Sequence, residues 1–100
     1  MKTIMMSKKE IALAKQLETE AFMTPTKAKA LIILTSQVAD VIVQTGLPKP
    51  REDEFIHIAD QLMGICSIAQ QRLLAGRAVE IAVEFRGIEL PIILNPATIH

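Results

Sequence analysis

The sequence has no tryptophan and no tyrosine, one cysteine and four glycines among its 100 residues. The lone cysteine, Cys66, excludes an internal disulfide and is typical of proteins in a reducing compartment. Three phenylalanines are the whole aromatic complement, too few for most base- or sugar-stacking platforms. The glycines form no phosphate-binding loop, and no paired-cysteine motif or serine nucleophile elbow occurs. We therefore predict that the chain is not an enzyme and binds no cofactor.

An excess of charge is also lacking. Eleven basic and eleven acidic side chains cancel, and the calculated pI is about 6.7. No global field then draws the protein to nucleic acid or to an anionic membrane. The longest apolar stretch, 28–43, is interrupted by polar residues and falls short of the roughly 20 residues that a membrane span needs. The first six residues do not form a signal peptide, so we predict a cytoplasmic protein without membrane contact.

Apolar residues, by contrast, are abundant. They make up 50% of the chain, the mean hydropathy is +0.32, and charged residues contribute 22%. A chain of this length is one domain, here 1–100. So apolar a composition is unusual for a small domain, and a subunit interface is the natural outlet for the excess. The composition therefore predicts a protein that associates with other chains.

Two helices are predicted in the first half. Ser7, followed three residues later by a glutamate, forms a capping-box pattern that starts a helix over about 8–22. Pro25 follows a threonine cap and starts a second helix, 25–45, which Gly46 ends. This second helix is apolar on nearly every side. We expect one chain to offer too few neighbours to cover it.

A third helix is predicted over 51–75, with acidic residues in its first turn and Gly76 after its end. Its apolar residues fall on two adjacent stripes at three- and four-residue spacing. Cys66 belongs to one of these stripes, so we interpret it as a core residue rather than a nucleophile.

A β-hairpin over 78–94 follows, because two alternating apolar patterns agree when the chain is folded at Arg86-Gly87. The predicted pairs on the apolar face are Val79 with Leu94, Ile81 with Ile92, Val83 with Leu90, and Phe85 with Ile88. Residues 95–100 are predicted to be a loose tail. An isolated hairpin is only marginally stable in water, so this one must pack against the helices or a second copy.

Pro91 interrupts the outer edge of the second strand, whereas the free edge of the first strand has no such block. We therefore predict a homodimer that joins through this free edge, through the second helix, or through both. The predicted interface residues are Val79, Ile81, Val83, Phe85, Ile33 and Val41.

Two alternatives remain for the polar residues. The lysines Lys8, Lys9, Lys27 and Lys29 would form a nucleic-acid patch if the helix ends that carry them met, although the neutral overall charge disfavours it. Glu54 and His57 form a Glu-x-x-His pattern of the kind used by di-iron helical proteins. One copy of so short a pattern arises easily by chance, and we predict no metal site.

These observations predict an α+β fold: three helices, then a C-terminal antiparallel hairpin packed on them, in a homodimer. The function they favour is non-enzymatic binding of another protein, as an adaptor, inhibitor or regulatory subunit. The alternatives are a dimeric nucleic-acid-binding regulator and, least favoured, a metal-binding helical protein. The sequence does not identify the partner.

Overall fold

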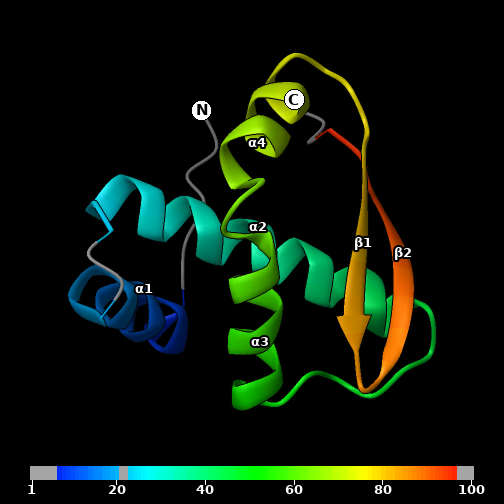
Figure 1. The fold of residues 1–100 in the computed structure, drawn as a ribbon, viewed down its shortest axis with the longest axis horizontal. Coiled ribbons are helices and arrows are strands. Elements are labelled where there is room, and N and C mark those ends of the chain that lie inside the picture. The colour runs from blue at the N-terminus through cyan, green and yellow to red at the C-terminus, as the bar shows by residue number, and fades with distance from the viewer. Residues whose placement is uncertain (1–6, 21–22, 97–100) are drawn as a thin grey trace.

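The computed structural model describes residues 7–20 and 23–96, which form four helices followed by a two-stranded antiparallel sheet (Figure 1). The elements are α1 (Lys8–Glu20), α2 (Pro25–Gln44), α3 (Glu52–Leu62), α4 (Cys66–Leu74), β1 (Val79–Phe85) and β2 (Ile88–Leu94). The α+β class is as predicted. The predicted end of the first helix at 21–22 and most of the predicted tail, 97–100, lie outside the described residues.

The caps that the sequence predicted for the first two helices are present. The Ser7 hydroxyl accepts a hydrogen bond from the Glu10 N–H at 3.2 Å, and the Glu10 carboxylate accepts one from the Ser7 N–H at 3.1 Å. The Thr24 hydroxyl caps α2 by accepting from the Lys27 N–H at 3.3 Å. Gly46 follows α2 with φ +94°, the left-handed conformation that ends many helices.

The predicted third helix, 51–75, is divided into α3 and α4, and this corrects the sequence interpretation. Met63, Gly64 and Ile65 form a tight turn between them, in which the Ile65 N–H donates to the Leu62 carbonyl at 3.1 Å. Each short helix turns its own apolar side to the core, α3 with Ile58, Ala59 and Leu62 and α4 with Cys66 and Ala69. The side chains that a straight helix would have aligned, Met63 and Ile65, are left exposed.

The hairpin has the predicted register throughout, including all four apolar pairs. Side chains of β1 alternate strictly between buried and exposed positions. The outer face of the sheet carries Glu80, Ala82, Glu84, Glu89, Pro91 and Ile93, all exposed. The sheet therefore packs on the helices with one face and leaves the other open.

The turn is tight, with Arg86 at φ +53° and Gly87 at φ +78°. A positive φ is unfavourable for arginine, but here its side chain contacts both Glu54 and the Phe85 ring. The guanidinium donates to the two Glu54 carboxylate oxygens at 2.6 and 2.9 Å, and it lies 4.7 Å from the centroid of the Phe85 ring. Contacts to α3 thus stabilise a turn that the local sequence alone supports poorly.

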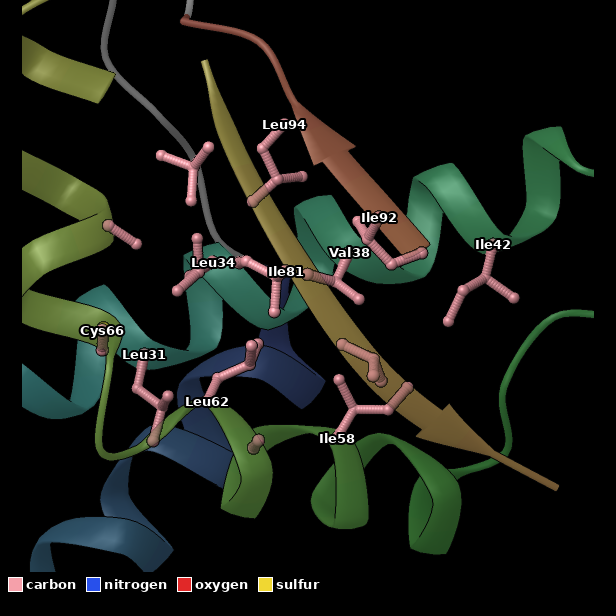
Figure 2. Packing of buried hydrophobic residues seen from close by; sticks show 14 of the residues in the cluster. Leu31, Leu34, Val38, Ile42, Ile58, Leu62, Cys66, Ile81, Ile92 and Leu94 are labelled. Carbon is pink, nitrogen blue, oxygen red and sulfur yellow. The ribbon is translucent and has the colours of Figure 1, made fainter. Parts of the chain in front are cut away.

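The main core lies between α2, the α3–α4 pair and the inner face of the sheet, where their apolar side chains point toward one another (Figure 2). A smaller cluster joins α1 to another side of α2 through Leu13, Ala14, Ala28 and Ile32. The expectation that one chain cannot cover α2 is therefore wrong for most of this helix, because α1 folds back on a side that the sheet leaves free. Ile33 and Val41 remain half-buried and Val43 exposed. No helix among the described residues has the length and apolarity to cross a membrane.

Candidate interaction surface

A groove of about 560 Å³ runs between the first half of α2 and α4. Its α2 wall consists of residues at helical spacing, so that one face of the helix is presented. Its lining residues include five apolar residues and one basic residue: Ile33, Leu34, Leu73, Leu74, Pro96 and Lys29. Its volume lies within the range of ligand pockets in proteins.

Leu74 lies at the rim of this groove and is 87% exposed, more than any other large apolar side chain in the described part of the chain. It is the last residue of α4, and Gly76 at φ +78° then turns the chain toward β1. Because the helix ends there, no later turn covers the side chain. The groove thus combines an apolar wall with an apolar side chain standing free at its edge.

Charges near the groove have one sign. The two stretches that line most of it, 26–37 and 70–76, contain Lys27, Lys29 and Arg72, whereas all eleven acidic residues lie elsewhere in the sequence. Lys29 lines the groove itself, and Arg77 directly follows the lining residue Gly76. In a chain with no net charge, the lining of this groove therefore includes a basic side chain and no acidic one among the described residues.

A second cavity, of about 300 Å³, lies where the N-terminal ends of α1 and α3 approach the middle of α2. Two polar contacts lie at this cavity: Lys9 lies 3.7 Å from Glu52, and the Ser36 hydroxyl donates to Glu10 at 2.6 Å. That hydrogen bond is the main reason that the pKa of Glu10 is lowered. These contacts join α1 to α2 and to α3.

The free edge of β1 is partly occupied by α3, which runs beside it in Figure 1. The Gln61 carboxamide donates to the Glu84 carbonyl at 2.8 Å and accepts from the Glu84 N–H at 2.8 Å, so it satisfies both outward backbone groups of that residue. Because bonded and non-bonded pairs alternate along the hairpin, the backbone N–H and C=O groups of Glu80 and Ala82 also point away from β2. Within the described residues, no hydrogen bond reaches their outward groups. The open edge is thus limited to the backbone groups of Glu80 and Ala82, and it is shorter than the sequence predicted.

Four of the six predicted interface side chains do not lie on a free surface. Val79, Ile81, Val83 and Phe85 are buried in the chain's own core. A partner at this strand could therefore reach its backbone edge but not these side chains. Of the two α2 residues, Ile33 lines the groove, and Val41 packs against the core.

The four predicted nucleic-acid lysines do not meet. Lys8 and Lys9 lie at the start of α1. Glu10, in the same first turn, accepts a hydrogen bond from Ser36 in the middle of α2. Lys27 is at the beginning of α2, about 13 Å along the helix axis from Ser36 at 1.5 Å per residue. All four side chains are exposed, but they form two separate pairs rather than one patch.

Glu54 and His57 are not arranged as a metal pair. Both Glu54 oxygens accept hydrogen bonds from Arg86, and these lower the pKa of the Glu54 carboxyl to about 2. His57 is exposed on α3. In the parts of the chain that the structure describes, no three His, Cys, Asp or Glu side chains are gathered as metal ligands. Cys66 is buried, and burial raises the pKa of its thiol, as for a core residue.

No protein-family model, curated protein or solved structure matches this chain. The α2–α4 groove is therefore described from the geometry of this chain alone. Sequence reasoning missed the groove, because α2 and α4 become neighbours only in the folded chain. The acid-free stretches 23–39 and 61–79 were a visible signal for it.

Proposed function

We propose that this chain is a small non-enzymatic protein that acts by binding another protein, as an adaptor, inhibitor or regulatory subunit, and that the α2–α4 groove is its docking surface. The observation that carries the proposal is the position of Leu74, 87% exposed at the rim of an apolar groove. Burying one leucine side chain stabilises a complex by about 1.5–3 kcal/mol. Large exposed apolar groups beside a concave wall are typical of interaction sites.

The test compares two leucine-sized positions on α4. Leu74→Ser removes the side chain at the groove, whereas Ile68→Ser removes one that is 57% exposed outside it. Both changes are at exposed positions, so we expect folding stability to change by less than about 0.5 kcal/mol. Affinity-tagged wild type, Leu74→Ser and Ile68→Ser are compared for the proteins that they retain from an extract of the native host. The proposal expects a protein that wild type and Ile68→Ser retain and Leu74→Ser loses. Identical retention by all three contradicts it.

Self-association is the second part of the proposal, and it uses a different surface. The unpaired backbone groups of Glu80 and Ala82 support a two-fold contact between β1 strands of two copies. Because Gln61 closes the edge at Glu84, the contact is short, and we expect a weak dimer whose population depends on concentration. Size-exclusion chromatography with light scattering tests this, and Gln61→Ala should strengthen the dimer by lengthening the open edge. A monomer at every concentration, in both proteins, contradicts it.

We also propose a cytoplasmic location, which the single buried cysteine supports.

A further inference from the structure

The groove selects its partner by charge as well as by shape. Resting on the proposed function, we propose that the α2–α4 groove binds an acidic amphipathic helix of a partner protein, with the apolar stripe of that helix against Ile33, Leu73 and Leu74 and its carboxylates toward Lys29 and Arg77. Two observations carry this: the apolar lining, and the absence of any acidic residue from both stretches that build the groove.

The shape favours a helix over an extended segment. The groove lies between two helices, and its α2 wall follows the i, i+3, i+4, i+7 spacing of one helix face, formed by Thr26, Lys29, Ala30, Ile33 and Gln37. A third helix can pack on such a pair with its own apolar stripe. An extended peptide gains most from pairing with a strand edge, and the groove offers no such edge.

The charge distribution favours an acidic partner over a neutral or basic one. Lys29 lines the groove, and Lys27 and Arg77 lie beside lining residues in the sequence. Among the described residues, none of these three has a carboxylate within 4 Å, so their charges are available to a partner. Opposite charges at a rim steer association and reject like-charged competitors.

Nucleic acid and lipid fit these residues less well. A phosphate backbone gains nothing from a leucine that is 87% exposed, and the chain has few aromatics on which bases could stack. An anionic bilayer would favour apolar residues on a convex face, whereas Leu74 borders a concave one.

The experiment uses synthetic fluorescein-labelled helical peptides. The Leu/Glu peptide has leucines at i, i+3, i+4 and i+7 with glutamates on the flanks. The Leu/Lys peptide replaces each glutamate by lysine, and the Ala/Glu peptide replaces each leucine by alanine. Fluorescence anisotropy gives the dissociation constants for the full chain. We expect the Leu/Glu peptide to bind, the other two to bind at least tenfold more weakly, and added salt to weaken binding.

A matched pair of lysine variants tests the charge directly. Lys29→Glu reverses a charge inside the groove, and Lys15→Glu reverses an exposed helical lysine of α1 outside it. Lys29→Glu should weaken the Leu/Glu peptide about fivefold, as expected for the loss of an exposed charge pair and its replacement by repulsion, and should improve the Leu/Lys peptide. Lys15→Glu should change neither. Leu74→Ser should abolish binding of both peptides.

Different results separate the acidic partner from the docking groove itself. Equal binding of the Leu/Glu and Leu/Lys peptides, both lost in Leu74→Ser, overturns the acidic partner and keeps the docking groove. No binding of the Leu/Glu peptide at millimolar concentration also overturns the inference, while the extract experiment decides the function separately. Tighter binding to phosphatidylglycerol vesicles than to the peptide, lost in Leu74→Ser, replaces the partner helix by a lipid. If self-association is lost in Leu74→Ser, the occupant of the groove is a second copy of the chain. If truncation after Pro96 raises the affinity for the Leu/Glu peptide tenfold, the occupant is residues 97–100.

Discussion

Glu54 links the start of α3 to the hairpin turn through one carboxylate. It accepts from the Arg51 N–H at 3.0 Å at the start of α3, and its two oxygens accept from Arg86 in the hairpin turn. The hydrogen bonds from Arg86 are the largest reason that the pKa of Glu54 lies near 2, below its ordinary 4.5. The residue that the sequence offered as a metal ligand is thus a fastening between α3 and the hairpin.

This pKa predicts a pH dependence of stability. A carboxyl whose pKa is lower in the folded than in the unfolded state stabilises the fold above the unfolded value and loses that contribution as the pH falls through the folded value. For Glu54 the window runs from about pH 4.5 down to about pH 2. We expect urea midpoints of the wild type to fall across this window more steeply than those of Glu54→Gln. The exposed Glu80→Gln serves as control and should follow the wild type. Parallel curves for Glu54→Gln and wild type would refute the coupling.

Gly64 and Gly87 allow the effect of backbone conformation on stability to be separated from the effect of available space. A Cβ at Gly64 or at Gly87 would meet no atom within 4 Å, but only Gly87 has a positive φ, +78°. Gly87→Ala should therefore cost about 1 kcal/mol of unfolding free energy through strain. Gly64→Ala should stabilise the chain by about 0.5 kcal/mol, because it restricts the unfolded state without strain. Chemical denaturation measures both, and equal effects would contradict the conformational argument.

At the scale of elements, the hairpin was the most predictable part. Its register follows from two seven-residue patterns that agree on one apolar face, and any shift by one residue would expose that face. The starts of α1 and α2 were predictable because Ser7 and Thr24 cap them locally. The turn at Gly64 was not, because an isolated glycine is tolerated in a helix and the break depends on how α3 and α4 pack on the core.

The hairpin assignment yields a prediction of its own. Ile81→Asp places a carboxylate on the buried face, where it has no partner, and should cost several kcal/mol. Glu80→Lys lies one residue away on the open face and should change stability by less than about 0.5 kcal/mol. Urea unfolding monitored by circular dichroism compares them. Similar destabilisation by both would mean that the two faces are wrongly assigned.

At the scale of the whole molecule, the chain hides more of its apolar surface than its composition suggested. α1 covers one side of α2, and the sheet and the α3–α4 pair cover the others. The sequence did not reveal this, because the thin apolar stripe of α1 gives no indication of which helix it packs on. The large apolar side chains that remain exposed are spread over several elements, and the most exposed of them in the described part of the chain, Leu74, borders the α2–α4 groove. The sequence analysis assigned the apolar surplus to the second helix and the first strand, but most of these side chains are buried within the chain.

Amide chemical shifts can locate the docking surface that we propose in the α2–α4 groove. Nitrogen-15-labelled full chain is titrated with the Leu/Glu peptide and followed by heteronuclear NMR. The account predicts shifts concentrated in 26–37 and 70–76, with none of comparable size on the outer face of the sheet or on α1. Shifts that instead centre on β1, or on Lys8 and Lys9, would contradict it.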